Sequence, residues 1–269
     1  MSVAEAAPES VIRVRGLVTH YGEREILHGI DLDVRRGEVM VIMGGSGSGK
    51  STLLRHMIRL EHPTQGRIEL LGRDICSMSE HDWAEFSRHL GVAFQGGALF
   101  SSLSVGENVM LPLRERTRLD PATMEIMMRM KLEVVSLAGF EHLMPAELSG
   151  GMIKRAAFAR AIITDPQLLF CDEPSAGLDP VVSAALDELI LRLRSAMGMT
   201  IVVVTHELES AFRIADRITV LDRGDVLVVG SVDEVRGSDN PRVQDLLQRR
   251  FEEEELDPDE YLARLTGGV

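Results

Sequence analysis

A glycine-rich loop directly after an apolar run constrains this chain more than any other feature of its sequence. Five consecutive apolar residues, 39–43, are followed by GGSGSGKST at residues 44–52 and then by a helical pattern that begins at Leu53. A continuous apolar run of this length is typical of a strand buried on both faces of a parallel sheet. The loop matches GxxxxGK[ST], the Walker A pattern, in the strand–loop–helix context that this pattern requires. The sequence therefore predicts an α/β fold with a phosphate-binding loop.

The physical chemistry of this loop suits a polyphosphate. Glycines let backbone N–H groups approach the phosphates, and the positive end of the following helix favours anions. We expect Lys50 to reach the β- and γ-phosphates and Ser51 to ligate Mg²⁺, so the loop predicts ATP or GTP binding rather than a plain flexible turn. The predicted nucleotide-binding residues of the loop are Gly44, Gly45, Ser46, Gly47, Ser48, Gly49, Lys50, Ser51 and Thr52.

Two adjacent acids follow a second apolar strand pattern at residues 168–171. Asp172 lies at the predicted end of the strand, where it can hold Mg²⁺ through water. Glu173 then projects toward the γ-phosphate and can polarise an attacking water, a form of assistance worth roughly 10²–10⁴ in rate. Acidic residues are common where a loop begins, so the pair alone does not indicate a catalytic site. The phosphate loop about 120 residues earlier is what favours a catalytic role.

The remaining pattern alternates strands and helices, which indicates a layered α/β domain. The segment from about 72 to 160 is richer in helix and is predicted to be a helical subdomain inserted between two core strands. After Asp216, two short strands are predicted to form a hairpin that turns at Arg223 and Gly224. Further strands are predicted at 11–18, 26–34 and 201–204, and helices near 121–138, 150–164 and 181–197.

Composition narrows the class of protein further. The chain has 42 acidic and 29 basic side chains, a net charge of −13, which disfavours general nucleic-acid binding. Its two cysteines, Cys76 and Cys171, form no CxxC pair and argue against a structural zinc site. No apolar run approaches the roughly 18 residues that span a bilayer. The N-terminus lacks the regions of a signal peptide, so we expect a soluble, cytosolic protein.

The sequence LSGGM at 148–152 resembles the LSGGQ signature of ATP-binding-cassette (ABC) ATPases, and it precedes the acidic strand as in that family. Other motifs follow in the family's order. Tyr21 resembles the aromatic A-loop residue that stacks on adenine, and Gln95 resembles the Q-loop glutamine that senses Mg²⁺. Asp179 lies in a segment similar to the D-loop, and His206 resembles the switch histidine that contacts the γ-phosphate.

This resemblance implies an α/β P-loop NTPase fold, the ABC nucleotide-binding domain, with an N-terminal antiparallel β subdomain and an inserted α-helical subdomain. The ATP-binding domain is expected at residues 9–246, its helical subdomain at about 96–162, and an acidic C-terminal tail at 247–269. The family also implies a homodimer, in which two cassettes close head to tail around two ATP molecules. ATP and Mg²⁺ are thus the expected cofactors, and ATP hydrolysis is the expected reaction.

The resemblance assigns roles residue by residue. The implied catalytic residues are Glu173, His206 and Gln95. The implied nucleotide-binding residues outside the phosphate loop are Tyr21, Ser149, Gly150, Gly151 and Asp179. The implied Mg²⁺ ligands, in part through water, are Ser51, Gln95 and Asp172.

Within the family, the sequence looks most like the ATPases of the maintenance-of-lipid-asymmetry (Mla) system, which moves phospholipid between bacterial envelope membranes. Met152 is shared with that subfamily, and segments 94–100, 124–137 and 240–243 support the likeness. It implies three partners: an integral-membrane permease (MlaE-like), a lipid-binding MCE protein (MlaD-like) and a STAS-domain protein (MlaB-like). The chain would then lie peripherally on the cytoplasmic face of the inner membrane. The Met-rich segment 124–137 suggests a groove for a permease helix.

Three alternatives stay open at this point. The nucleotide motifs fit equally an importer of polar amino acids or other small solutes. A mechanical ABC ATPase that acts on DNA or ribosomes is disfavoured by the acidic charge and by the single cassette, with only about 100 residues between Lys50 and Ser149. A small-molecule kinase would share the phosphate loop but would leave the signature and His206 unexplained.

Overall fold

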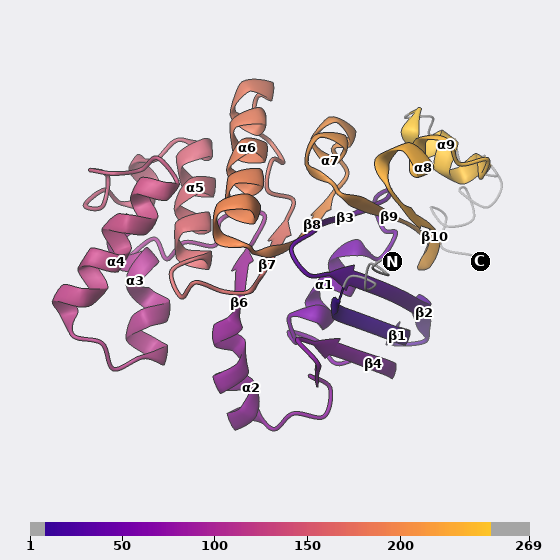
Figure 1. Ribbon diagram of the computed structural model, residues 1–269, viewed down its shortest axis with the longest axis horizontal. Helices are drawn as coiled ribbons and strands as arrows, with labels where there is room; N and C mark the ends of the chain where they lie inside the picture. The colour runs from indigo at the N-terminus through magenta and orange to yellow at the C-terminus, as the bar shows by residue number, and fades with distance from the viewer. Residues whose placement is uncertain (1–8, 249–269) are drawn as a thin grey trace, which may run out of the picture.

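Two β-sheets organise the chain, of which the computed structural model describes residues 9–248. The larger sheet has six strands and runs through the centre of the molecule (Figure 1). Five of them are parallel, and β10 pairs antiparallel to β9 at one edge. In sheet order the strands are β10 (Asp225–Gly230), β9 (Arg217–Asp222), β3 (Val39–Met43), β8 (Thr200–Thr205), β7 (Leu168–Asp172) and β6 (Leu90–Ala93).

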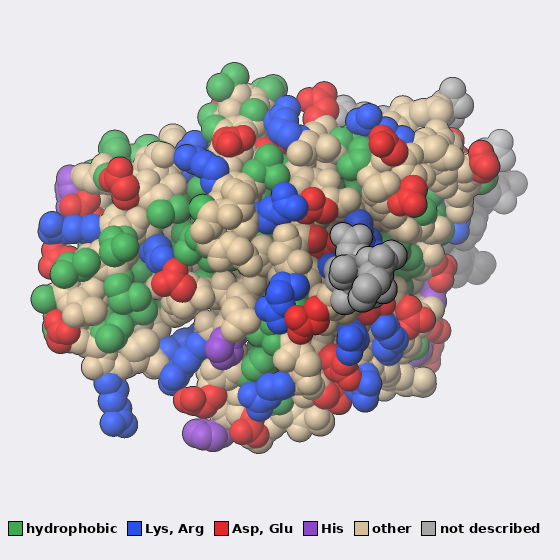
Figure 2. Space-filling model, viewed as in Figure 1, with side chains coloured by type: hydrophobic (Ala, Val, Ile, Leu, Met, Phe, Trp, Pro, Cys, Tyr) green, Lys and Arg blue, Asp and Glu red, His purple; other side chains and the backbone are tan. Residues whose placement is uncertain are grey.

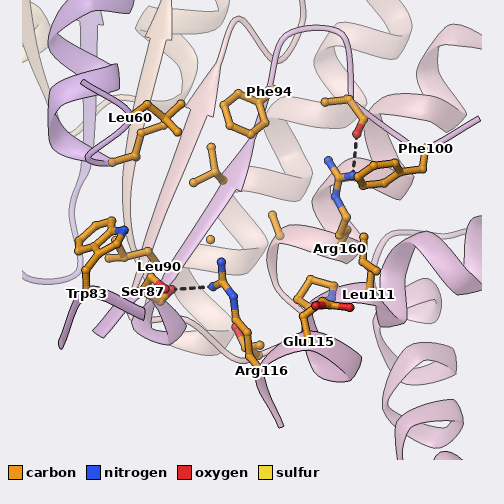
Figure 3. Close-up of a pocket in the computed structure, with 17 residues that line it drawn as sticks. Leu60, Trp83, Ser87, Leu90, Phe94, Phe100, Leu111, Glu115, Arg116 and Arg160 are labelled. Carbon is orange, nitrogen blue, oxygen red and sulfur yellow. Dashed lines mark hydrogen bonds between the residues drawn. The ribbon is translucent and has the colours of Figure 1, made fainter. Parts of the chain in front are cut away.

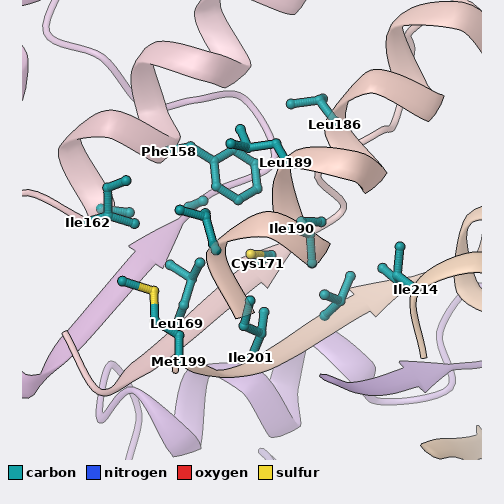
Figure 4. Packing of buried hydrophobic residues seen from close by; sticks show 14 of the residues in the cluster. Phe158, Ile162, Leu169, Cys171, Leu186, Leu189, Ile190, Met199, Ile201 and Ile214 are labelled. Carbon is teal, nitrogen blue, oxygen red and sulfur yellow. The ribbon is translucent and has the colours of Figure 1, made fainter. Parts of the chain in front are cut away.

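The central strands are buried on both faces, as their apolar runs predict. In β3, Val39, Val41 and Met43 face one hydrophobic cluster, while Met40 and Ile42 face the other. The first cluster packs the sheet against α5 and α6, and Figure 4 shows Phe158 of α5 in it beside Leu189 of α6. The parallel sheet is therefore a rigid layer that presents the carboxyl ends of its strands to the loops that follow them.

A four-stranded antiparallel sheet covers the other face. Its strands in sheet order are β2 (Arg24–Arg35), β1 (Ser10–Tyr21), β4 (Gln65–Leu70) and β5 (Arg73–Asp74). Helix α1 (Lys50–Met57) packs between the two sheets, since its Leu53, Leu54 and Met57 share a cluster with residues of both. This sheet is the predicted N-terminal antiparallel β subdomain.

Helices form a lobe at one end of the core sheet (Figure 1). The lobe consists of α3 (Val105–Arg116), α4 (Pro121–Val134) and α5 (Gly150–Ala161), preceded by the short helix α2 (Glu80–Phe86). Two 3₁₀ turns lie at Ser87–His89 and Pro145–Glu147. Figure 2 shows hydrophobic side chains gathered over this lobe, at the left of the view. The later helices are α6 (Pro180–Met197), α7 (Leu208–Ile214), α8 (Val232–Arg236) and α9 (Pro241–Leu247).

The main differences from the sequence prediction concern short or capped elements. Strand β6 lies inside segment 72–160, which the sequence predicts to be helical, and it pairs with β7 at the sheet edge. The helix predicted at 121–138 ends at Val134, because Ser136 takes a left-handed conformation with φ of 59°. The predicted hairpin turn is confirmed, with φ of 48° at Arg223 and 83° at Gly224. Most of the tail predicted at 247–269 lies outside the described residues.

Candidate nucleotide-binding and hydrolysis site

The phosphate loop lies between the end of β3 and the start of α1 and is fixed by close contacts with β9. A Cβ on Gly44 would lie 2.0 Å from the Leu221 carbonyl oxygen, so only glycine fits there. Gly47 and Gly49 have φ of 74° and 99°, the left-handed region that glycine enters without strain. Because no side chain caps the start of α1, its first N–H groups are available to an anion.

Lys50 is buried at the start of α1 and folds over the loop. Its Nζ donates hydrogen bonds to the carbonyl oxygens of Gly44, at 2.9 Å, and Gly45, at 2.7 Å. Burial lowers the pKa of the Lys50 ammonium, while the carboxylates of Glu173 and Asp172 oppose that effect. The lysine predicted to bind phosphates and the two predicted carboxylates thus belong to one electrostatic site.

Glu173, the second of the two acids at the end of β7, is held by contacts with β8 and with His206. Glu173 has a left-handed φ of 47°, and its N–H donates to the carbonyl of Val204 in β8 at 2.9 Å. His206, just after β8, donates from Nδ1 to Glu173 Oε1 at 2.8 Å. Glu173 is buried, and its second oxygen, Oε2, has no hydrogen-bond partner within residues 9–248. One oxygen is therefore held by His206, and the other is left for a further donor such as water.

Asp172 and its neighbours contain further buried oxygens without partners. Burial raises the pKa of the Asp172 carboxyl, and the adjacent Glu173 carboxylate raises it further. Across the described part of the chain, Asp172 Oδ1, Ser48 Oγ and Ser175 Oγ are buried and lack a hydrogen-bond partner. Such atoms are costly unless a ligand, ion or water satisfies them. Their concentration at the phosphate loop and the β7 end fits a site built to receive polar groups.

A lysine that the sequence reasoning missed connects this site to the Q-loop segment. Lys154 of α5 donates from Nζ to the carbonyl oxygens of Gln95 and, at 3.1 Å, of Glu173. The Gln95 side chain itself is exposed. Lys154 lies in the sequence IKRAAFARA, and its contacts are 59 and 19 residues away, so no local pattern marks it.

The signature and D-loop residues lie together, with exposed ends. Ser149 caps α5, since its Oγ accepts a hydrogen bond from Met152 N at 3.3 Å. Asp179 caps α6 in the same way, through N–H groups of the first turn. A Cβ on Gly151 would lie 2.7 Å from Val182 of α6, so the two helix starts pack closely. Ser149, Gly150 and Asp179 are exposed at this surface.

Tyr21 stands at the end of β1, apart from these contacts. Its ring is exposed, and its hydroxyl donates to the Glu61 carboxylate, which also pairs with Arg55 at 3.2 Å. The His56 ring lies 3.1 Å from the Glu61 carbonyl, and its other nitrogen lies 2.7 Å from the Thr19 hydroxyl. Glu61 is a second residue that sequence reasoning missed.

Comparison with known proteins identifies the class. Residues 27–176, more than half of the chain, match the ABC transporter family, and the chain belongs to that family. The fold predicted from the sequence is confirmed, and the chain is an ABC-type ATP hydrolase.

Among individual proteins, the chain is similar to the intermembrane phospholipid transport system ATP-binding protein MlaF of Haemophilus influenzae. The two are 40% identical over 89% of this chain and 91% of that protein. It is also 39% identical to the probable ribonucleotide transport ATP-binding protein mkl of Mycobacterium leprae, over 89% of this chain and 69% of the relative. A dimeric post-hydrolysis structure of the ATP-binding cassette MJ0796, bound to ADP and Pi, is 30% identical. The structural match covers 82% of this chain and 98% of the MJ0796 chain, with a TM-score of 0.76.

Among residues 9–248, no helix is both long and apolar enough to cross a bilayer.

Proposed function

We propose that this chain is the ATP-binding and ATP-hydrolysing subunit of an ABC transporter that moves phospholipid between the membranes of a bacterial envelope, which maintains lipid asymmetry. The observation that carries the hydrolytic part is the pairing of buried Glu173 with His206 beside Lys50. The transport part is supported by the 40% identity with MlaF across nearly the whole length of that protein.

In this proposal the nucleotide is held by the phosphate loop, residues 44–52. N–H groups of the loop and of the α1 start bind the phosphates, and Lys50 exchanges its contacts with loop carbonyls for phosphate oxygens. Tyr21 stacks on the base, and its hydroxyl is held by Glu61. His206 contacts the γ-phosphate from its exposed position after β8.

The residues at this site suit a Mg²⁺ ion that binds together with the nucleotide. No group of three or more His, Cys, Asp or Glu side chains in residues 9–248 could hold a metal alone. In nucleotide sites Mg²⁺ uses one or two carboxylates together with phosphate oxygens and waters, and Asp172 Oδ1, buried and without a hydrogen-bond partner in residues 9–248, is a suitable oxygen. Asp172 would hold it through water, with Ser51 and Gln95 as further ligands. When bound, Mg²⁺ neutralises charge on the phosphates.

Glu173 is the residue that we propose as general base. It accepts a proton from the attacking water, whose oxygen bonds to the γ-phosphorus while the bond to the β-phosphate oxygen breaks, leaving ADP and phosphate. His206 holds Oε1 at 2.8 Å, so the carboxylate keeps one orientation, and Oε2, which has no partner in the described part of the chain, faces the water.

Two copies of the chain are proposed to form the working unit. Ser149, Gly150 and Asp179 are exposed, and the positive start of α5 faces outward with them. A second subunit's γ-phosphate would satisfy this helix start, as the family resemblance implies. The similarity to a dimeric cassette structure bound to ADP and Pi supports this arrangement.

A groove near the Q-loop segment supports a membrane partner. The cavity, of about 520 Å³, lies between β6, α2 and α3 (Figure 3). Trp83, Phe94, Phe100 and Leu111 contribute apolar and aromatic surface to its lining. An amphipathic helix from an integral-membrane permease suits such a lining.

The permease we propose is MlaE-like, with an MlaD-like MCE protein and an MlaB-like STAS-domain protein completing the complex. The permease would hold the chain at the cytoplasmic face of the inner membrane. The Met-rich helix α4 does not line this groove; its Met124 and Met128 line a second cavity, of about 360 Å³, together with Met110 of α3, and a permease helix there stays a prediction. Met128 of α4 is buried in the helical lobe, while Met130 and Ile126 are exposed on another face.

A second candidate substrate is a polar solute. The relatives named mkl are described as probable ribonucleotide transport proteins and are 39% identical to this chain. The chain covers only 67–69% of those relatives, whereas it covers 90–91% of the MlaF proteins. The fuller match favours phospholipid.

The test is to purify the chain with its membrane partners from native membranes. Lipid extracted from the complex would be identified by mass spectrometry, and ATPase activity would be compared with added phospholipid vesicles or ribonucleotides. We expect bound phospholipid and lipid-stimulated hydrolysis. Stimulation by ribonucleotides with no bound lipid would support the polar-solute candidate, and a chain without ATPase activity in the complex would contradict the proposal as a whole.

A further inference from the structure

Lysine is used sparingly in this chain. Of its 29 basic residues, only Lys50, Lys131 and Lys154 are lysines, and the rest are arginines. All three lysine side chains are buried, at 7%, 8% and 7% exposure respectively. Burying an ammonium group is costly unless its donors are satisfied. The buried ammonium group of Lys50 donates to a carbonyl of the phosphate loop, and that of Lys131 forms an ion pair with Asp165. Within residues 9–248, Lys154 forms no ion pair with a carboxylate and instead donates to two main-chain carbonyls.

The two carbonyls that Lys154 contacts belong to two different segments of the proposed site. Gln95 lies in the Q-loop segment after β6, and Glu173 lies at the end of β7. Lys154 itself lies just over one turn into α5, the helix that starts at the signature serine, Ser149. One ammonium group therefore joins three segments that the proposed function assigns to Mg²⁺, to the attacking water and to the partner's nucleotide.

The contact with Glu173 has a specific structural consequence. Glu173 is a non-glycine residue with a φ of 47°, a strained conformation that persists only when its surroundings enforce it. Its N–H is fixed by the carbonyl of Val204, and its C=O is fixed by Lys154. These two contacts hold the peptide groups on either side of the Glu173 Cα, and so determine where its carboxylate meets His206.

We propose that Lys154 is a positioning residue for ATP hydrolysis, which holds the main chain of Glu173 and Gln95 in their productive places from the signature helix. The proposal rests on the function proposed above. In it, a shift of α5 when the signature meets the partner's nucleotide is passed through Lys154 to the base and to the Q-loop segment. The hydrogen bonds that Lys154 donates go to Gln95 and Glu173 and not to the phosphate loop at 44–52, so its loss affects turnover rather than nucleotide affinity.

The experiment compares Lys154→Met with Lys131→Met in the full-length chain. Both changes remove a buried ammonium of similar exposure, but Lys131 pairs with Asp165 in the helical lobe. For Lys154→Met we expect kcat to fall on the order of tenfold to a hundredfold, as for a misplaced catalytic group, with KM for ATP within about twofold. For Lys131→Met we expect kcat within about twofold of the wild type, even where the melting temperature falls.

Two further variants separate positioning from folding. Lys154→Arg keeps the charge and the donors and should restore most of kcat, and Lys154→Gln keeps donors without charge and should restore part of it. The ¹⁵N resonance of His206 Nδ1 should shift in Lys154→Met, because Glu173 moves away from the ring, and should stay unchanged in Lys131→Met. Circular dichroism confirms that each variant is folded.

The proposal is overturned if Lys154→Met turns over ATP like the wild type, if kcat falls equally in both methionine variants, or if Lys154→Arg restores nothing. Glu173→Gln, measured beside them, tests the proposed function separately. Normal turnover in Glu173→Gln would remove the proposed base. A loss of turnover in Glu173→Gln, combined with normal turnover in Lys154→Met, would contradict only the role of Lys154.

Discussion

The first glycine of the phosphate loop allows a quantitative prediction with a matched control. Gly44 does not have a positive φ, so a side chain there is excluded by space and not by backbone conformation. An alanine Cβ would lie 2.0 Å from the Leu221 carbonyl oxygen of β9 and 2.7 Å from Ser48 Oγ. The adjacent Gly45 also lacks a positive φ, and a Cβ on it would have no atom within 4 Å. The two substitutions therefore differ only in what the new methyl group meets.

The size of the effect follows from the overlap. An ordinary contact between carbon and a carbonyl oxygen is about 3.3 Å, so Gly44→Ala forces the loop and β9 apart by about 1 Å. Overpacking of this kind costs about 1–3 kcal/mol, and we expect the upper part of that range because the opposing atom belongs to the main chain. For a domain of this size, about 2–3 kcal/mol corresponds to a fall in melting temperature of about 5–10 °C.

The assay is thermal and urea denaturation of both variants, together with ATP affinity by calorimetry. Gly44→Ala should unfold earlier and bind ATP more weakly, because the loop is displaced from the end of β3. Gly45→Ala should stay within about 0.5 kcal/mol of the wild type in stability. Equal stability of the two variants would show that β9 does not fix the loop, and the reasoning from close contact would be refuted.

Three further predictions follow from the proposed roles. Glu173→Gln keeps the size of the side chain and the oxygen that accepts from His206, so the protein should bind ATP and remain closed as a dimer. We expect its kcat in a phosphate-release assay to fall at least about a hundredfold. Near-normal turnover would show that Glu173 is not the base. Lys50→Ala should lose ATP affinity in calorimetry, because a charge-assisted phosphate contact disappears, and unchanged affinity would contradict the assignment. Ser149→Ala should leave ATP binding to the single subunit intact and reduce turnover, whereas loss of that binding would place Ser149 in the subunit's own pocket.

The sequence predicted those parts of the fold and site whose signals are local. The loop at 44–52, the strand β3 and the hairpin turn at Arg223 and Gly224 each depend on neighbouring residues, and the structure has them where expected. Strand β6 was missed because it is only four residues long, contains Gly91 and is defined by its parallel pairing with β7. Four residues provide too little periodicity for a strand to be recognised.

The site illustrates the same limit. The order of motifs indicates which residues matter, but contacts between distant segments decide how they are held. Three such contacts join residues far apart in the sequence. They are the close approach of the Leu221 carbonyl to Gly44, the hydrogen bond from His206 to Glu173, and the two hydrogen bonds of Lys154. A buried cation within a helix of small apolar residues looks like an ordinary surface lysine until the tertiary structure places it.

The scarcity and burial of lysine have a practical consequence for work on this protein. Reagents that acylate side-chain amines will find no freely exposed lysine on the folded chain, since all three lie at 7–8% exposure. Amine-directed cross-linkers are therefore poorly suited to mapping its neighbours, and carboxylate-directed reagents are the better choice. The rate at which Lys50 and Lys154 become modified would instead report how often the nucleotide pocket and the signature helix open to water.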